Sequence, residues 1–330
     1  MLDKLANFSE NDIPEFSKMT QAFQQNKIDE KQKKLNLAFL QACQKGTVKD
    51  VENALKMGAD INAVDGNPTL GVQGTSGLMF ALVFQNYEVA DYLIQNPKTD
   101  VNKVSDFYSN ALIQAVDKKV PISVLESLLK RKDLNVNGQS SGGQTALHTA
   151  VWERNTEATK LLLGHPIIYV NFPNGRGDTP LHLAVVRENK EIVSALLEHP
   201  QINPMAVNNK GRTALHDAAD IGYVEYVTLL SRNLKVNPNA QDNEGNTPLH
   251  LSVMSRHKEA AETLISSGRV NVSVQNDQEK TAGDYAADYE TRRMLYQASR
   301  PQKRSLIAPM RRYRPVFPSK GNSLRGRERE

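Results

Sequence analysis

The sequence is poor in the residues on which disulfides and many reactive sites depend. Its 330 residues include a single cysteine, Cys43, so no disulfide can form within the chain. A lone thiol fits a reducing compartment, and we expect a cytoplasmic protein. Paired-cysteine and His-Glu-x-x-His spacings are absent, which removes the common sequence signs of a zinc site. The sequence therefore predicts no metal and no cofactor.

Long apolar runs and an export signal are also missing. The longest apolar run, residues 77–84, is far too short to cross a bilayer. The chain opens with Met1-Leu2-Asp3-Lys4 and continues in polar sequence, unlike a secretory signal peptide. We therefore expect a soluble protein without a classical export signal.

Positive charge is scarce outside the C-terminal end. Residues 300–330 hold ten Lys or Arg and two Asp or Glu, so the preceding residues carry a net charge of −4 although the whole chain carries +4. Nucleic-acid binding relies on clustered positive charge. The sequence therefore predicts no nucleic-acid binding through the body of the chain.

What the chain does contain is a short motif that recurs at a constant interval. Thr179-Pro180-Leu181-His182 has copies that begin at Thr145, Thr213 and Thr247, so the motif histidines stand at positions 148, 182, 216 and 250. This even spacing matches the length of a turn plus two short helices. Threonine is a favoured N-cap, proline suits the first helical position, and the histidine is close enough to hydrogen-bond the threonine. We assign structural roles to Thr179, Pro180, Leu181, His182, His148, His216 and His250.

The motif and its surroundings resemble the ankyrin repeat. The family pattern is nearly intact in Asp242-Asn243-Glu244-Gly245-Asn246-Thr247-Pro248-Leu249-His250, and four copies stand in register. The resemblance covers roughly residues 37–299. It implies an all-α fold, an ankyrin-repeat solenoid of stacked helix pairs with β-hairpin fingers along one edge.

These patterns divide the chain into three parts. Residues 1–28 form an N-terminal extension or cap with a short helix that begins at Asp12-Ile13-Pro14-Glu15 and runs through Phe23, residues 29–299 form about seven repeats plus a C-terminal half-repeat cap, and residues 300–330 form a basic, disordered tail. A β-branched residue followed by asparagine closes each repeat, and we expect this asparagine to bond local backbone. The pairs are Ile61-Asn62, Val101-Asn102, Val136-Asn137, Val170-Asn171, Ile202-Asn203, Val236-Asn237 and Val270-Asn271.

The resemblance also implies where a partner would bind. In the family, the concave face is formed by positions that follow the motif histidine and by the finger tips. Several of these positions are apolar here, and exposed Trp, Met and Arg are typical of interfaces. The alternative is that neighbouring repeats or the N-terminal extension cover Trp152 and Phe84. The predicted partner-binding residues are Phe80, Phe84, Trp152, Glu153, Val186, Arg187, Asp220, Ile221 and Met254.

We therefore predict a non-enzymatic interaction protein, monomeric, that binds a peptide or a folded domain. In one alternative, Lys303-Arg304 and Arg311-Arg312-Tyr313-Arg314 of the tail address the chain to a nuclear import factor or an anionic membrane. In another, Cys43 is the nucleophile of an enzyme. The abundance of Lys, Asn and Gln, the missing signal peptide and the charged tail also resemble ankyrin proteins that intracellular bacteria inject into host cells.

Overall fold

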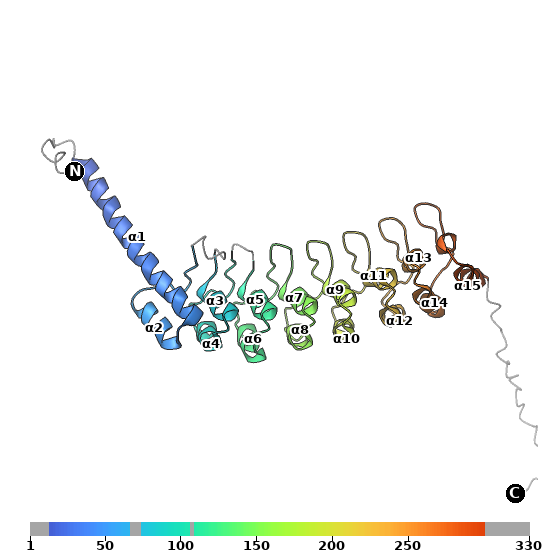
Figure 1. Ribbon diagram of the computed structural model, residues 1–330, viewed down its shortest axis with the longest axis horizontal. Coiled ribbons are helices and arrows are strands. Elements are labelled where there is room, and N and C mark those ends of the chain that lie inside the picture. The colour runs from blue at the N-terminus through green and yellow to red at the C-terminus, as the bar shows by residue number, and fades with distance from the viewer. Residues whose placement is uncertain (1–12, 67–73, 106–108, 301–330) are drawn as a thin grey trace, which may run out of the picture.

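Pairs of short helices, stacked side by side in one row, make up the chain. The computed structural model describes residues 13–66, 74–105 and 109–300, with backbone alone for residues 13–27. The described parts of the loops between consecutive pairs extend to the same side of the row (Figure 1). Within the described residues there are helices and isolated β-bridges but no β-strand. The predicted all-α repeat solenoid is confirmed.

Each pair has an inner helix, next to the fingers, and an outer helix that follows it. The inner helices are the C-terminal part of α1 (Ile13–Lys45), then α3 (Gly77–Val83), α5 (Ala111–Asp117), α7 (Ala146–Trp152), α9 (Pro180–Val186), α11 (Ala214–Ile221) and α13 (Pro248–Met254). The outer helices are α2 (Val48–Lys56), α4 (Tyr87–Gln95), α6 (Ile122–Leu129), α8 (Thr156–Leu163), α10 (Lys190–Glu198), α12 (Val224–Arg232) and α14 (Lys258–Ser266). A 3-10 helix, η4 (Ala282–Tyr285), and α15 (Tyr289–Ser299) follow.

The first helix differs from the sequence-based expectation. The sequence predicts a helix that ends at Phe23, in an extension separate from the repeats, yet α1 runs unbroken from Ile13 to Lys45. Its last turns pack against α3, where Gly77 permits close approach. A Cβ atom on Gly77 would lie 2.6 Å from the ring of Phe39. The inner helix of the first repeat is therefore the C-terminal part of α1, and the rest of α1 projects beyond the row (Figure 1).

From α3 onward, one leucine per inner helix fills the space between neighbouring pairs. These side chains are essentially fully buried, including the two in repeats that lack the Thr-Pro-Leu-His motif. In those two repeats Ser76 and Asn110 accept the N–H groups of Met79 and Ile113, so both helices keep a side-chain N-cap. Packing and capping thus persist where the motif is lost. The leucines are Leu78, Leu112, Leu147, Leu181, Leu215 and Leu249.

Asparagines tie the ends of successive repeats together. Asn171 donates from Nδ2 to the carbonyl of Gln201 (2.7 Å) and accepts at Oδ1 from the N–H of Asn203 (2.8 Å). The same two-bond bridge is made by Asn62, Asn102, Asn137 and Asn239. We call these five residues the asparagine ladder. Asparagines were expected to bond local backbone, and only part of the set, such as Asn203 and Asn237, does so.

Candidate partner-binding surface

Buried histidines hold the fingers against the inner helices. In α11, Nδ1 of His216 accepts the N–H of Thr213 (3.1 Å), so its ring proton is on Nε2 and is donated to the carbonyl of Asn246 (3.1 Å) in the next finger. His148, His182 and His250 make the equivalent pair of contacts. Burial lowers the pKa of all four imidazoles, to about 4 for His148 and His216. They are neutral structural links at pH 7.

The finger tips are joined to one another through their backbones. The N–H of Asn209 donates to the carbonyl of Arg176 (3.1 Å), and the N–H of Asn243 donates to that of Lys210 (3.0 Å). Gly211, with φ of 72°, sits so close to the next finger that a Cβ atom would lie 2.2 Å from Oδ1 of Asn243. From the finger that holds Gly142 to the finger that holds Asp277, these bonds form a continuous wall on one side of the inner helices.

A stripe of side chains runs along the inner helices beneath this wall, one residue per repeat. Its members lie at the C-terminal ends of the inner helices and are Phe84, Lys118, Trp152, Val186, Asp220 and Met254. The last four stand two residues before the positive-φ turn residue of their repeat, whereas Phe84 and Lys118 stand one residue before it. The four apolar members are 47%, 43%, 41% and 43% exposed, in chain order. We call these six residues the concave stripe. Neither neighbouring repeats nor the described part of α1 covers its apolar members.

The remaining predicted partner residues surround the stripe in different ways. Phe80 is only 7% exposed and stacks on Phe84, with ring centroids 6.1 Å apart, so it supports Phe84 from below. Ile221 is half-buried at the end of α11. Glu153 is also half-buried and forms an ion pair with Lys119 over 3.2 Å.

Arg187 and Trp152 form a pair that links two repeats. The Arg187 guanidinium lies 4.5 Å from the centroid of the Trp152 ring, and its Nε donates to the Trp152 carbonyl (2.9 Å). Such stacking of a guanidinium on an indole is attractive. The two residues belong to different repeats, so only the repeat register, combined with side-chain direction, could have indicated the contact. Arg187 is a partner of Trp152, and its charge is not a free one at the rim.

A groove of about 730 Å³ lies between the stripe and the fingers. Trp152 forms part of its wall, and small residues of the fingers line the opposite side. Three carboxylates face it, those of Asp117, Glu153 and Asp178, together with Arg176. The full lining is Ser109, Ile113, Gln114, Asp117, Ser140, Gly142, Gln144, Thr149, Trp152, Glu153, Asn174, Gly175, Arg176, Asp178 and Leu183.

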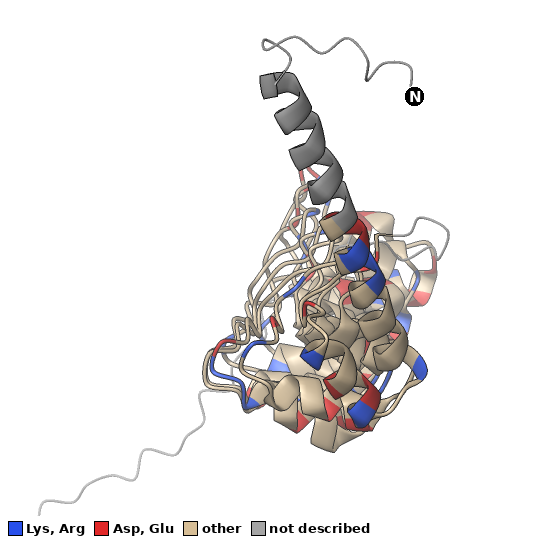
Figure 2. Ribbon diagram, turned by 90° about the vertical axis from the view of Figure 1, so that its left-hand side faces the viewer, with Lys and Arg blue, Asp and Glu red and all other residues tan. Residues whose placement is uncertain are grey.

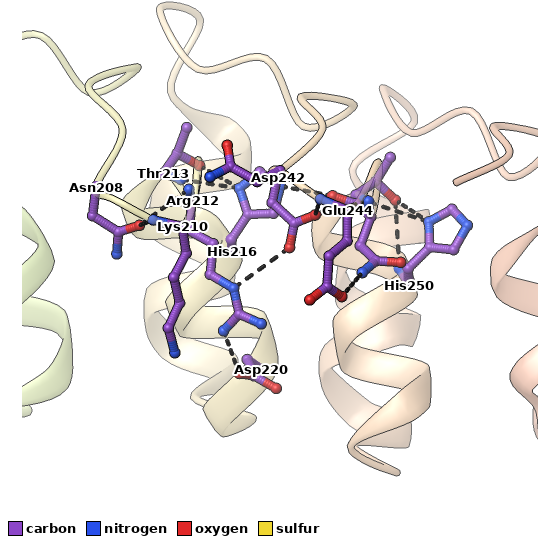
Figure 3. Close-up of polar contacts among 12 residues, drawn as sticks. Asn208, Lys210, Arg212, Thr213, His216, Asp220, Asp242, Glu244 and His250 are labelled. Carbon is purple, nitrogen blue, oxygen red and sulfur yellow. Dashed lines mark hydrogen bonds and ion pairs between the residues drawn. The ribbon is translucent and has the colours of Figure 1, made fainter. Parts of the chain in front are cut away.

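Further along, an arginine connects the stripe to the next finger. Arg212 donates to Asp220 (2.7 Å) and lies 3.5 Å from the carboxylate of Asp242 (Figure 3). Burial alone would raise the pKa of Asp220, but hydrogen bonds from Ser255 and Arg212 hold it below its ordinary value. Asp220 is therefore a paired anion.

Asp217, on the same helix as Asp220, has a raised pKa and not a lowered one. Burial raises the pKa of this carboxyl to about 7, and the neighbouring Asp178 and Asp220 add to the effect. In the view from the N-terminal end of the row, the acidic and basic residues of the ribbon are interspersed (Figure 2).

The described residues offer little for metal, membrane or thiol chemistry. Within ranges 13–66, 74–105 and 109–300, no group of three or more His, Cys, Asp or Glu side chains could hold a metal ion. No helix in these ranges has the length and apolar character to cross a membrane. Cys43 is fully buried, and burial raises the pKa of its thiol to about 12.

Comparisons with known proteins agree with this architecture. The family model described as "Ankyrin repeats (3 copies)" matches residues 78–174, 167–242 and 226–304. The chain belongs to the ankyrin-repeat family. Among solved structures, the ankyrin repeat domain of Bcl-3, titled a unique member of the IkappaB protein family, is similar with 26% identity and a TM-score of 0.62. That match covers 68% of this chain and 99% of the Bcl-3 chain.

The search of curated proteins found no match for this ankyrin chain. Ankyrin repeats are in general protein–protein interaction modules and are typically non-catalytic. Ankyrin arrays share a fold and differ in the side chains on their surface, so the function of this array must be argued from its surface residues.

Proposed function

We propose that this ankyrin array is a non-enzymatic module that binds a protein segment along its concave face. The observation that carries the proposal is the concave stripe, with four apolar side chains between 41% and 47% exposed at the C-terminal ends of their inner helices. A row of exposed apolar side chains under a polar wall is typical of a surface that a partner covers.

The arrangement suits a peptide that is extended or forms an amphipathic helix. Its apolar side chains would contact Trp152, Val186 and Met254, and its polar ones would meet Lys118 and Asp220, which interrupt the row. In such grooves a few buried anchors carry most of the binding free energy. Finger-tip residues would add contacts on the other side.

The enzyme alternative has little support in the chemistry of Cys43. A nucleophilic cysteine needs its thiolate near neutral pH and access to substrate. Full burial denies access, and a thiol pKa raised to about 12 disfavours the thiolate. We infer that Cys43 packs α1 against its neighbours.

Binding with matched variants tests the proposal. Partners recovered with the full chain should be recovered about tenfold less well with Trp152→Ala, since a central aromatic anchor is lost. Leu234→Ala is the control, because Leu234 is an exposed apolar residue outside the stripe. Thermal melting should be nearly unchanged in both. Equal losses for the two variants, or unfolding by Trp152→Ala, would place the binding surface elsewhere.

The finer assignments stay predictions. The tail residues Lys303, Arg304 and Arg311–Arg314 lie outside the described residues, so a nuclear or membrane address rests on their sequence alone. Action inside a host cell, a cytoplasmic location and a monomeric state rest likewise on sequence. Deleting residues 300–330 tests the address, because it should shift location and leave groove binding unchanged.

A further inference from the structure

The groove beside Trp152 is unusual for an apolar binding site because carboxylates line it. Asp117 and Glu153 lie at the ends of inner helices α5 and α7, and Asp178 lies in the finger opposite. Trp152 is 43% exposed even with Arg187 stacked on it, so part of the indole still faces the groove. An aromatic surface beside several carboxylates is a setting that favours a cation.

The pairing of these carboxylates leaves them available. Glu153 and Asp117 are paired with Lys119 (3.2 Å) and Lys118 (2.8 Å), but both pairs are open to solvent, with 30% to 57% of each side chain exposed. Such exposed pairs are worth little, so an incoming cation can replace the lysines at small cost. Asp178 is half-buried, and its Oδ1 accepts from Nδ2 of Asn208 (2.9 Å).

The polar groups of the groove also argue against other occupants. A purely apolar side chain would remove water from the carboxylates and offer them no partner, which is costly. An acidic side chain would meet repulsion from the same groups. Among the described residues that line the groove, Arg176 is the one cation, and it is exposed at the finger tip.

We propose that this groove binds an arginine or lysine side chain of a protein partner, within a segment whose neighbouring residues are apolar. The cation lies against the indole of Trp152, within reach of Glu153 and Asp178, and an apolar neighbour covers Val186. Arginine suits the site better than lysine, since its planar group stacks on aromatic rings and binds carboxylates with two donors. This inference rests on the proposed function, because it names the chemistry of the segment that the concave face would take.

Negative potential around the groove supports the assignment. Asp217 is close enough to Asp178 for the two carboxyls to repel each other, which contributes to the raised pKa of Asp217. The chain before residue 300 carries a net charge of −4. A basic segment would therefore be attracted at long range as well as in the groove.

A displayed library of random peptides, selected on the full chain, tests the proposal without a known partner. The single tryptophan of the chain is Trp152, so its fluorescence reports directly on the groove when a selected peptide is added. We expect selected peptides to contain arginine or lysine next to apolar residues and to change this fluorescence with saturation. Replacing the selected arginine by citrulline, which keeps the shape and removes the charge, should weaken binding about tenfold.

Variants of the chain provide a second test of the proposal. Glu153→Gln combined with Asp178→Asn should weaken the same peptides about tenfold and reduce the salt dependence of binding. Glu198→Gln is the matched control, because Glu198 is an exposed acid at the end of outer helix α10. It should leave binding unchanged.

The outcomes separate this inference from the proposed function. Peptides that need Trp152 but contain no cation, or that are acidic, would overturn the inference and leave concave binding intact. Peptides that bind equally well to Trp152→Ala and Val186→Asp would overturn both. A selection that enriches no peptide would also count against both.

Discussion

The backbone N–H of Asn237 donates to the thioether sulfur of Met205 over 3.1 Å. At equivalent junctions the acceptor is the Oδ1 atom of a ladder asparagine, as in the bond from Asn203 to Asn171 (2.8 Å). The N–H of Met205 is itself bonded to the side chain of Asn203, as the N–H of Asn239 is to Asn237. Met205 thus occupies a ladder position with a weak acceptor and without an amide donor.

Met205→Asn should therefore stabilise the array. The asparagine would replace a weak bond to sulfur and add a bond to the carbonyl of Lys235, just before Asn237, as at the other junctions. Each net hydrogen bond contributes on the order of 1 kcal/mol, and some apolar burial of Met205 is lost, so we expect a gain of about 1 kcal/mol. Urea unfolding of the full chain measures it.

The reverse change supplies the control. Asn171→Met removes both ladder bonds at the preceding junction and should destabilise by about 1–2 kcal/mol. If Met205→Asn lowered stability as well, the packing of Met205 would outweigh the ladder at this junction.

The ladder also shows what sequence could and could not predict. The constant repeat spacing, the capping threonine and the core leucines are local signals, so the fold followed from them. The Ile202-Asn203 pair was predicted as the equivalent of Val170-Asn171. In Ile202-Asn203-Pro204-Met205, however, the bridging position is displaced along the chain from Asn203 to Met205. The repeat pattern does not reveal such a shift, so the sequence could not predict which residue makes the bonds between these two repeats.

The turn between the paired helices contains a further irregularity. Its equivalent positions have positive φ, a conformation that costs a side-chain-bearing residue roughly 1 kcal/mol relative to glycine. Only one of them is glycine, namely Gly222 with φ of 85°. The others are Gln85, Lys119, Arg154, Glu188 and Arg256, with φ between 52° and 62°.

Gln85→Gly should therefore stabilise by about 1 kcal/mol, because the side chain is exposed and the strain disappears. Gly222→Ala should destabilise by more than that, since its Cβ would also lie 2.4 Å from Nδ1 of His257. Calorimetric melting of the two variants against the native chain measures both. A lower melting temperature for Gln85→Gly would mean that the turn is not strained.

Acid should weaken the array through its motif histidines. Burial lowers the pKa of His148 and His216 from 6.5 to about 4. Between those values the unfolded chain binds more protons than the folded one, so stability is present above pH 6.5 and falls as the pH drops toward 4. From pH 7 to pH 5 each of the two histidines should cost about 2 kcal/mol.

Asp217 opposes this trend. Its folded pKa of about 7 exceeds the ordinary 3.8, so the folded chain binds the extra proton in this range and gains about 2 kcal/mol between pH 7 and pH 5. Asp217→Asn removes that gain. Over the same interval the variant should therefore lose more stability than the native chain, by about 2 kcal/mol. Urea unfolding at each pH measures the difference, and parallel losses in the two proteins would show that Asp217 ionises normally.

The binding surface was harder to predict than the fold. The position of Trp152 on the concave face followed from its place after the motif. Its contact with Arg187 did not, because it depends on which way two long side chains turn across a repeat boundary. Phe80 was predicted as a partner residue from the same register, yet the structure places it beneath Phe84. Register locates a residue on a face, but neighbouring side chains decide how much of it is exposed.

The C-terminal unit should open before the rest of the array. Its inner element is the short η4 in place of a full helix, and α15 buries only Thr291 and Leu295. In contrast, α11 buries five residues and has a helix pair on each side. An end unit with one neighbour and little buried apolar area has little to hold it closed. Amide hydrogen exchange should therefore be fastest in α15 and slowest across α7 to α12.

Two leucine variants test this order of opening. Leu295→Ala should speed exchange in α15 alone. Leu215→Ala, which should cost about 2–5 kcal/mol of stability, should speed exchange throughout the central repeats. Uniform exchange in the native chain, or a central effect of Leu295→Ala, would show that the array opens as one unit.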